Sequence, residues 1–234
     1  MEDTQPQLIP YDRMLEVGMH FGRKRTVFNP GMKDSVHSLR DGICIIDLFK
    51  TQEALVKAIT LINEVRAQGG IILCVALTKQ SEEGILALAT RGNMPYVLGR
   101  WLGGTLTNFK EISSRVKHLQ KLEDEKTSGA WDKHTKKERL TLERECAKMK
   151  VRFDGLKKLT RAPDLIILGS LSEGTLAVHE AKCTNVRVIA IGNTDANPAG
   201  VEVVIAANDR SKKSVDLILD TITERLEDIP VVSS

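Results

Sequence analysis

The sequence predicts an α/β fold in which a parallel sheet has helices on both faces and carries an inserted, projecting antiparallel coiled-coil hairpin. Two observations predict it. Short apolar runs alternate with amphipathic helical patterns before residue 105 and after residue 161, as in consecutive βαβ units. Residues 106–160 instead combine a narrow apolar stripe with a highly charged background. We therefore divide the chain into an α/β core (1–105 and 161–234), an inserted hairpin (106–160) and a flexible N-terminal arm (1–12).

The core elements follow from the spacing of apolar residues. Before the insertion we expect a strand at 43–46, a helix at about 50–66, a strand at 71–77, a helix at 81–91 and a strand at 94–98. After it we expect a strand at 164–168, a helix at 174–183, strands at 187–191 and 201–205, and a closing helix at 211–227. Leu55, Ile59 and Ile62, for example, recur at the spacing of one helix face.

The insertion has the pattern of two helices that share one apolar seam. Apolar residues recur at intervals of three and four on both sides of a turn at 127–129: Phe109, Ile112, Val116 and Leu119 before it, and Leu142, Cys146, Met149, Phe153 and Leu156 after it. Such spacing is typical of a coiled coil. We expect only this seam to be buried, so that the hairpin projects from the core. Trp131, near its tip, is interpreted as a small local core for the turn, with a partner contact as the alternative.

Charge is segregated along the chain, although the formal net charge is only +3. Residues 110–161 contain sixteen Lys and Arg against nine Asp and Glu, and residues 20–40 contain five against one, so the remainder is acidic. Two basic regions of this kind indicate a polyanionic partner such as RNA. Solvated helix faces without any partner are the alternative.

Signatures of catalysis, cofactor binding and membrane insertion are missing from the sequence. Neither GxGxxG nor GxxxxGK[ST] follows a predicted strand, and no acid–base pair or nucleophile has a convincing context. Cys44, Cys74, Cys146 and Cys183 form no CxxC pair and are interpreted as free thiols in a reducing compartment. The N-terminus is acidic and polar, and no apolar run approaches the length of a membrane helix. We expect a cytoplasmic protein that is not an enzyme and holds no cofactor or metal.

The most informative stretch is 99–109, which follows a predicted strand. Arg100 and Trp101 come directly before Gly103-Gly104, and no acid, nucleophile or metal ligand accompanies them. A cation and an aromatic ring at a glycine-rich turn can contact a phosphate and stack on a base. The stretch therefore predicts a docking surface, with Trp101 stacking or wedging against RNA.

A second basic segment lies near the N-terminus. Arg23, Lys24 and Arg25 are predicted to form a loop with Phe28-Asn29-Pro30, in which guanidinium groups pair with phosphate oxygens and the aromatic ring takes a base. His20, just before them, is interpreted as making a structural hydrogen bond, with donation to a phosphate as the alternative. Over the whole chain, the predicted RNA-binding residues are Arg23, Lys24, Arg25, Lys33, Arg40, Lys79, Arg100, Trp101, Lys136, Lys137, Arg144 and Lys148.

A polar segment, 193–198, follows the predicted strand at 187–191. Because ligands of open α/β sheets bind at the carboxyl ends of strands, Asp195 and Asn197 could hold a cation there. The interpretation we favour is a side-chain-capped turn before Pro198.

Several separated motifs stand out. They are Met14-Leu15-Glu16 with His20-Phe21-Gly22, Asn29-Pro30 with Met32, Ile45-Ile46-Asp47-Leu48 with Lys50-Thr51, Arg100-Trp101-Leu102-Gly103-Gly104 with Leu106-Thr107-Asn108, Thr135-Lys136-Lys137-Glu138, Pro163-Asp164, Glu180-Ala181 and Asn208-Asp209. In this order they resemble the bacterial-type ribosomal protein S2 family, the second protein of the small ribosomal subunit. The resemblance runs from about residue 14 to residue 226, and the ordered set is specific where each motif alone is weak.

The resemblance implies a Rossmann-like sheet with an inserted helical hairpin, and no catalysis. It also implies a ribosome-bound protein that contacts small-subunit rRNA near the junction of head and body, beside neighbouring small-subunit proteins. In many bacteria the family also provides the docking site for the large OB-fold ribosomal protein that captures mRNA.

The chain departs from the family pattern at charged positions. The family has His-Gln where this chain has Arg23-Lys24, which makes the local contacts more purely ionic. Two acids of the family correspond to Ser170 and Gly174, and its Asp-Thr-Asn-x-Asp-Pro segment is Asn-Thr-Asp-Ala-Asn-Pro at 193–198. Because this chain has fewer carboxylates there than the family, the sequence leaves open whether a magnesium site exists near residues 193–198.

Two other functions stay open at this point. One is an enzyme on the same scaffold that binds a phosphorylated small molecule at the 193–198 edge. The other is an interaction module whose hairpin clamps a protein partner, with the basic charge incidental.

Overall fold

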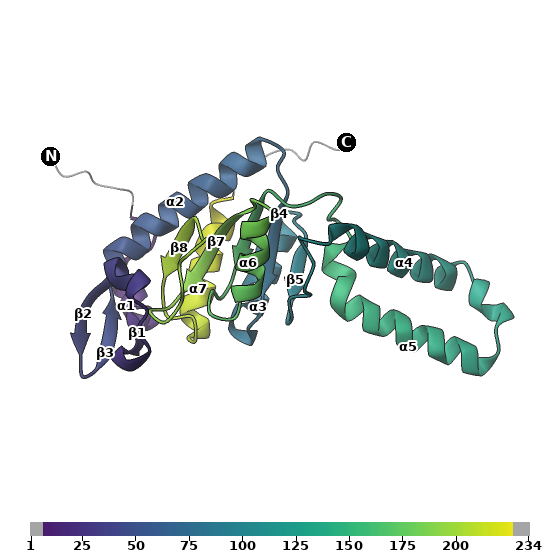
Figure 1. Ribbon diagram of the computed structural model, residues 1–234, viewed down its shortest axis with the longest axis horizontal. Helices are drawn as coiled ribbons and strands as arrows, with labels where there is room; N and C mark the ends of the chain where they lie inside the picture. Colours follow the sequence, from purple (N-terminus) through teal and green to yellow (C-terminus); the bar gives the residue numbers. More distant parts are fainter. Residues whose placement is uncertain (1–6, 227–234) are drawn as a thin grey trace.

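Five parallel strands form the sheet that organises the molecule (Figure 1). They are β4 (Ile72–Ala76), β5 (Tyr96–Leu98), β6 (Leu165–Leu168), β7 (Arg187–Gly192) and β8 (Val203–Ala206). Their order across the sheet is β5-β4-β6-β7-β8, and every neighbouring pair is parallel. The structure is a computed structural model and describes residues 7–226. β4 and β6 are buried along their whole length, as strands covered on both faces are, and the predicted parallel α/β sheet is confirmed.

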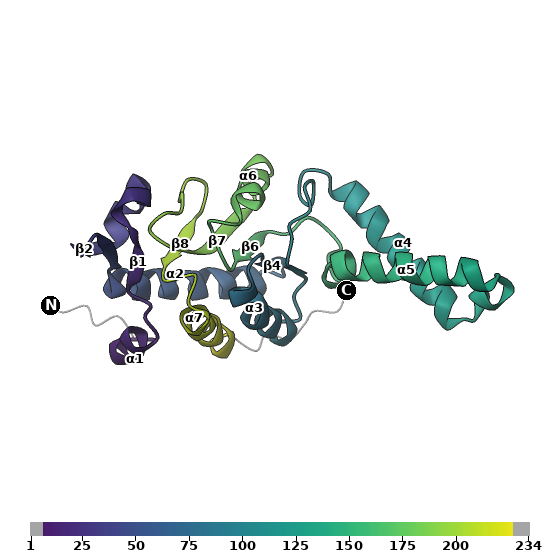
Figure 2. The same ribbon diagram turned by 90° about the horizontal axis from the view of Figure 1, so that it is seen from below.

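Helices cover both faces of this sheet, as Figure 2 shows from below. The helices are α2 (Leu48–Ala67), α3 (Lys79–Arg91) and α7 (Lys212–Glu224) on one face, and α6 (Thr175–Cys183) on the other. Leu55 of α2 and Ile218 of α7 share one apolar core with Ile72 of β4. The next strand residue, Leu73, belongs to a second core with Ala177 of α6. Alternate strand residues therefore fill two separate cores. The predicted end of the last helix, at 227, lies outside the described residues.

A separate antiparallel sheet lies beyond β8, at one end of the molecule (Figure 1). It consists of β1 (Phe21–Lys24), β2 (Val36–Arg40) and β3 (Ile43–Ile46) in the order β1-β3-β2, with α1 (Tyr11–Glu16) and two short 3-10 helices, η1 (Arg25–Val27) and η2 (Pro30–Ser35). Contrary to prediction, the run 43–46 is not part of the parallel sheet, and Arg23 and Lys24 lie in a strand. Asp41 and Gly42, with φ of 49° and 76°, form a tight turn that pairs β3 with β2.

The segment before α1 is packed against α2. Ile9 is 2% exposed, and the Leu8 N–H donates to Gln52 Oε1 at 3.3 Å. The Gln52 side chain in turn donates to the Ile9 carbonyl. The part of the predicted N-terminal arm that the structure describes, residues 7–12, thus packs on the body, and its flexibility stays a prediction. Residues 1–6 lie outside the described part of the chain.

The inserted hairpin projects from the β5 side of the sheet (Figure 1). Its helices are α4 (Phe109–Thr127) and α5 (Lys136–Phe153), joined by the 3-10 turn η3 (Ala130–Lys133), and a further 3-10 turn, η4 (Asp154–Leu156), leads back to the core. Val116 and Leu119 of α4 and Cys146 and Phe153 of α5 are buried in one apolar cluster. These are predicted seam positions, and supercoiling of the two helices stays a prediction.

Trp131 is 5% exposed and belongs to the same cluster, so its interpretation as a local core is confirmed.

Within residues 7–226, no helix combines the length and apolarity that crossing a bilayer requires.

Candidate nucleic-acid interface

Two predicted RNA-binding cations lie where parallel strands end. Lys79 begins α3 directly after the β4 loop, and Arg100 follows β5. Gly99, with φ of 75°, forms the turn from which Arg100 leaves the strand. Because parallel strands end at the same edge, these two exposed side chains belong to one side of the body. We call Lys79 and Arg100 the edge cations.

Trp101, in contrast, is buried, with an exposed fraction of 6%. Its indole N–H donates to Glu180 Oε1 at 3.0 Å. Glu180 also accepts from the backbone N–H groups of Gly104 at 2.8 Å, Leu106 at 3.0 Å and Thr107 at 3.4 Å. One carboxylate of α6 thus holds the whole loop against the body. The ring of Trp101 lies in the core and its N–H already has an acceptor, so the burial offers no support for the predicted stacking on RNA, which stays a prediction.

Glu180 remains charged although it is only 4% exposed. Burial alone would raise the pKa of Glu180, but the hydrogen bonds from Trp101 and the loop backbone outweigh it and hold the pKa below its ordinary value. The sequence marks Glu180 as part of a motif without revealing this role, since its donors lie 73 to 79 residues earlier in the chain.

Arg23 is also occupied inside the protein. Its guanidinium pairs with Asp209 at 2.8 Å and Asp195 at 3.2 Å, and its side chain is 14% exposed. Its backbone N–H donates to Thr194 Oγ1 at 2.9 Å. Arg23 therefore fastens β1 to the loops that follow β7 and β8. Both of its ion-pair partners belong to the chain itself, so Arg23 already has a role inside the fold, and its contact with an RNA phosphate stays a prediction.

Asp209 lies at the centre of a polar network at this edge. Burial raises its pKa, opposed by the charge of Arg23 and by hydrogen bonds from Asn193 and Ser170. The Asn193 amide donates to Asp209 at 3.4 Å, and the Ser170 hydroxyl donates at 3.3 Å. A magnesium ion does not fit here, because the Arg23 guanidinium already bridges Asp209 and Asp195. Among residues 7–226 no three side chains are grouped to hold a metal ion.

The segment 193–198 forms the side-chain-capped turn that we favoured from the sequence. Asn193 Oδ1 accepts from the Thr194 N–H at 2.7 Å, and Asn197 Oδ1 accepts from the Ala199 N–H at 3.1 Å. These local bonds fix the turn without a ligand.

Ten of the twelve predicted residues are exposed and make no ion pair within the described part of the chain. Besides the edge cations, they are the small-sheet cations Lys24, Arg25, Lys33 and Arg40, and the hairpin cations Lys136, Lys137, Arg144 and Lys148. Other lysines of the hairpin are used internally. Lys150 and Lys157 both pair with Glu123, at 2.8 and 2.7 Å. The structure thus separates cations that hold the fold from cations that remain free for a partner.

The free cations do not form one surface. The small sheet and the tip of the hairpin lie at opposite ends of the molecule, with the parallel sheet between them (Figure 1). The two basic regions expected from the sequence thus correspond to the small sheet and the hairpin, and the edge cations form a third group between them.

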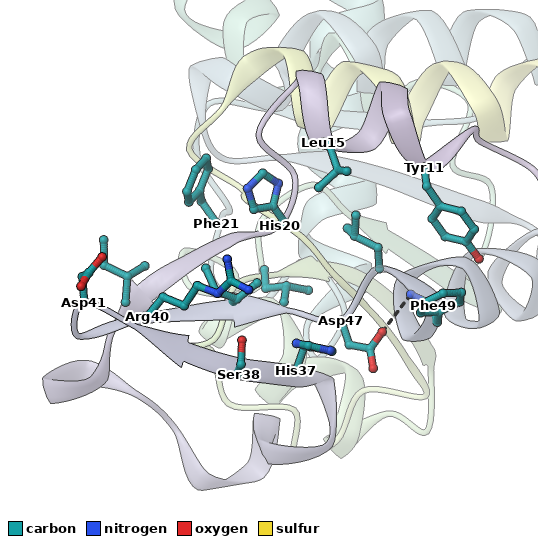
Figure 3. A pocket seen from close by; sticks show the side chains of 14 residues that line it. Tyr11, Leu15, His20, Phe21, His37, Ser38, Arg40, Asp41, Asp47 and Phe49 are labelled. Carbon is teal, nitrogen blue, oxygen red and sulfur yellow. Dashed lines mark hydrogen bonds between the residues drawn. The ribbon is translucent and has the colours of Figure 1, made fainter.

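A groove of about 720 Å³, which sequence analysis missed, lies between α1, the small sheet and the start of α2 (Figure 3). Leu15, Phe21 and Phe49 line it and are 48%, 48% and 64% exposed. They come from three separate segments, and a single exposed apolar residue carries no signal in a sequence. Their convergence is visible only in the folded chain.

His20 also lines this groove, and its ring packs on Phe21 with 4.1 Å between centroids. Burial lowers the pKa of His20. Its Nδ1 is shielded from solvent and has no hydrogen-bond partner in the described structure. The structural hydrogen bond that we expected is therefore not made by this nitrogen.

Comparison with known proteins places the chain in a family. The profile described as "Ribosomal protein S2" matches residues 14–228. "Small ribosomal subunit protein uS2" of Bifidobacterium adolescentis is 40% identical over 212 residues, which are 90% of this chain and 78% of that protein. Its counterpart from Thermus thermophilus is 39% identical over 214 residues, or 92% of this chain and 84% of that protein. The matches span the parallel sheet and the hairpin alike, and the chain therefore belongs to the ribosomal protein S2 family.

Proposed function

We propose that the chain binds small-subunit rRNA near the junction of head and body through its three groups of free cations, and that its apolar groove docks a neighbouring protein. As a family member it is a structural constituent of the small ribosomal subunit, and not an enzyme. Ribosomal RNA and other ribosomal proteins are accordingly its partners, and it is ribosome-bound in the cytoplasm.

The proposed RNA contacts are supported by the difference between cations that make ion pairs within the protein and cations that do not. Arg23, Lys150 and Lys157 make close ion pairs within the protein, whereas the ten free cations are exposed and make none in the described part of the chain. An exposed, unpaired guanidinium or ammonium keeps all its donors for phosphate oxygens. Such contacts position a protein on RNA without reading its sequence, so specificity comes from the shape of the RNA.

The test removes two small-sheet cations and leaves the internal one in place. In Lys24→Ala/Arg25→Ala, we expect weaker binding of purified small-subunit rRNA and a shallower salt dependence. The log–log slope falls by about 0.7 to 0.9 for each lost phosphate contact. Binding is measured by filter retention over a series of salt concentrations.

The control is Lys57→Ala/Arg91→Ala. Both residues are exposed and unpaired in the described structure, and they lie on α2 and at the end of α3. This variant has the same net charge as the first. If both double variants show the wild-type slope, the small-sheet cations are not part of the RNA interface.

The groove carries the second half of the proposal, docking of the large OB-fold ribosomal protein that captures mRNA. Its lining combines the exposed apolar side chains of Leu15, Phe21 and Phe49 with polar groups of His20 and Asp47. Concave apolar surfaces with a few polar groups are typical of sites that take an anchoring side chain of a partner. The unpartnered Nδ1 of His20 can accept a hydrogen bond from an incoming donor.

To test the docking, a charge is placed in the groove. Phe49→Asp should reduce at least tenfold the amount of purified OB-fold protein retained on subunits that carry the variant, since a carboxylate would be desolvated there. Val151→Asp is the matched control, because Val151 is 83% exposed on the hairpin. Equal retention by both variants would remove the groove from the docking proposal.

A further inference from the structure

A second hollow, of about 550 Å³, lies at the tip of the hairpin, beside the turn between α4 and α5. Its lining includes Lys126 from the end of α4, Trp131 from η3, and Lys136, Leu140 and Glu143 from α5. Both sides of the hairpin thus contribute to one concave surface. The role of Trp131 as a local core accounts for its ring, but not for its polar atom.

The indole N–H of Trp131 is a buried donor without an acceptor. Trp131 is 5% exposed, and its Nε1 has no hydrogen-bond partner in the described structure. A donor that loses water and gains no acceptor destabilises the fold, and native proteins rarely leave one. A phenylalanine ring would fill the same apolar site without this cost. The other tryptophan of the chain, Trp101, is also buried, but its indole N–H donates to Glu180.

The charge around the hollow is positive. The Lys126 ammonium lies 5.6 Å from the centroid of the Trp131 ring and 3.6 Å from Glu143. Lys136 is exposed and makes no ion pair within residues 7–226, and the same is true of Lys133 on the other side of the turn. The carboxylate of Glu143 is thus neutralised by Lys126, and the charge of Lys136 is left without a partner in the described structure.

We propose that this hollow receives a backbone phosphate of RNA. The phosphate oxygens accept from Lys136, from Lys126 and from the otherwise unused N–H of Trp131, with the flexible Lys126 side chain moving aside to admit them. The inference rests on the proposed binding of rRNA and adds a specific contact to it.

A strand of RNA fits this surface better than a single carboxylate of a protein. Lys137, Arg144 and Lys148 are seven and four residues apart, so they lie on one face of α5. This face is about a quarter turn around the helix from the face of Lys136 and Leu140 that lines the hollow. A row of free cations matches the repeating charge of a polyanion, whereas one carboxylate would use only the first of them.

The indole N–H resonances offer a direct test. The chain has two tryptophans, and the full-length protein labelled with ¹⁵N gives two indole signals, assigned with Trp131→Phe. On titration with uridine monophosphate, the Trp131 signal should shift and saturate. The Trp101 signal should stay fixed, because its donor is already bonded to Glu180. Lys136→Ala should weaken the response several-fold, whereas Lys117→Ala, which removes an exposed charge elsewhere on α4, should not.

Binding of small-subunit rRNA gives the second measurement. Trp131→Phe should raise the thermal midpoint slightly, because it removes the unpaired buried donor, and should bind rRNA about fivefold more weakly. Lys136→Ala should lower the log–log salt slope by about 0.7 to 0.9. If glutamate shifts the Trp131 signal and uridine monophosphate does not, the hollow takes a carboxylate and the inference is wrong. If both variants bind rRNA like the wild type, the inference also fails while the proposed function stands. Failure of the wild type itself to bind would instead overturn the proposed function.

Discussion

Glu180 and Arg23 are both charged, both largely buried, and both hold a loop against the parallel sheet. Each satisfies its charge within the chain: Glu180 accepts from Trp101 and from the backbone that follows it, and Arg23 pairs with Asp195 and Asp209. Charges paired in this way cost far more to break than exposed ones do. At the residue scale, some motif residues of the sequence therefore hold loops of the candidate interface in place and are not themselves free to contact a partner.

Replacing Glu180 by glutamine should lower the free energy of unfolding at neutral pH by about 1 to 3 kcal/mol, because one acceptor oxygen is exchanged for a donor that faces other donors. The pKa of Glu180 is lowered in the folded state. Its stabilising effect is therefore complete above the ordinary carboxyl pKa and is lost as the pH falls through the lowered value. The difference between wild type and Glu180→Gln should shrink accordingly in acid.

Urea unfolding at a series of pH values measures this difference. Glu202→Gln is the control, since Glu202 is exposed and has no ion pair in the described structure. A difference for Glu180→Gln that does not change with pH would mean that the charge of Glu180 is not what holds the loop.

Arg23 leads to a prediction about metal removal. Because its guanidinium bridges Asp195 and Asp209, chelation with EDTA should leave the thermal midpoint of the free protein unchanged. Arg23→Ala should instead cost about 3 kcal/mol, since it leaves a buried carboxylate unpaired. Lys24→Ala, at an exposed neighbouring position, should cost almost nothing. A fall in the wild-type midpoint on chelation would show that the folded protein binds a metal ion and would contradict this prediction.

At the scale of elements, the hairpin is stabilised along its own seam and fixed to the body only at its base. Leu119 is fully buried within the hairpin. Gly155, in η4, lies so close to β5 that a Cβ atom on it would clash with the carbonyl oxygen of Tyr96. The chain from Gly155 onward therefore packs with the core. The predicted boundary at 105/106 divides the loop that Glu180 holds, so a cleaner division comes a few residues later.

Replacement of residues 110–152 by a short Gly-Ser linker should leave a body that unfolds cooperatively. The core under α2, α3 and α7 is built without hairpin residues. The core under α6 is continuous with the hairpin seam, but its strand residues and those of α6 remain in the shortened chain. Circular dichroism should show less helix, with the near-ultraviolet signal of Trp101 retained. Leu119→Ala in the full chain is the companion variant and should destabilise the hairpin by about 2 to 5 kcal/mol. A body that no longer folds would make the hairpin part of the core.

At the scale of the whole molecule, the sequence predicts those features whose cause is local. The parallel strands are continuous apolar runs, and the seam of the hairpin repeats at three and four residues, so both are visible in single segments. The small sheet is visible only in part: the Asp41-Gly42 turn between β2 and β3 is a local signal, but β1 pairs with β3 about 20 residues further along the chain. The roles of Arg23 and Trp101 are not visible, since the acids that bind Arg23 lie 172 and 186 residues away. Residue type alone does not distinguish an internal cation from a free one.

Because free cations lie at both ends of the molecule, the chain offers two separated attachment points for RNA instead of one continuous binding surface. Once one end is attached to RNA, the other end is confined within reach of its own site, and its attachment becomes an intramolecular step. The angle at which the hairpin leaves the body then sets the distance and direction between two attachment points (Figure 1). In the proposed binding mode, the protein thereby fixes how far apart, and at what tilt, two regions of an RNA are held.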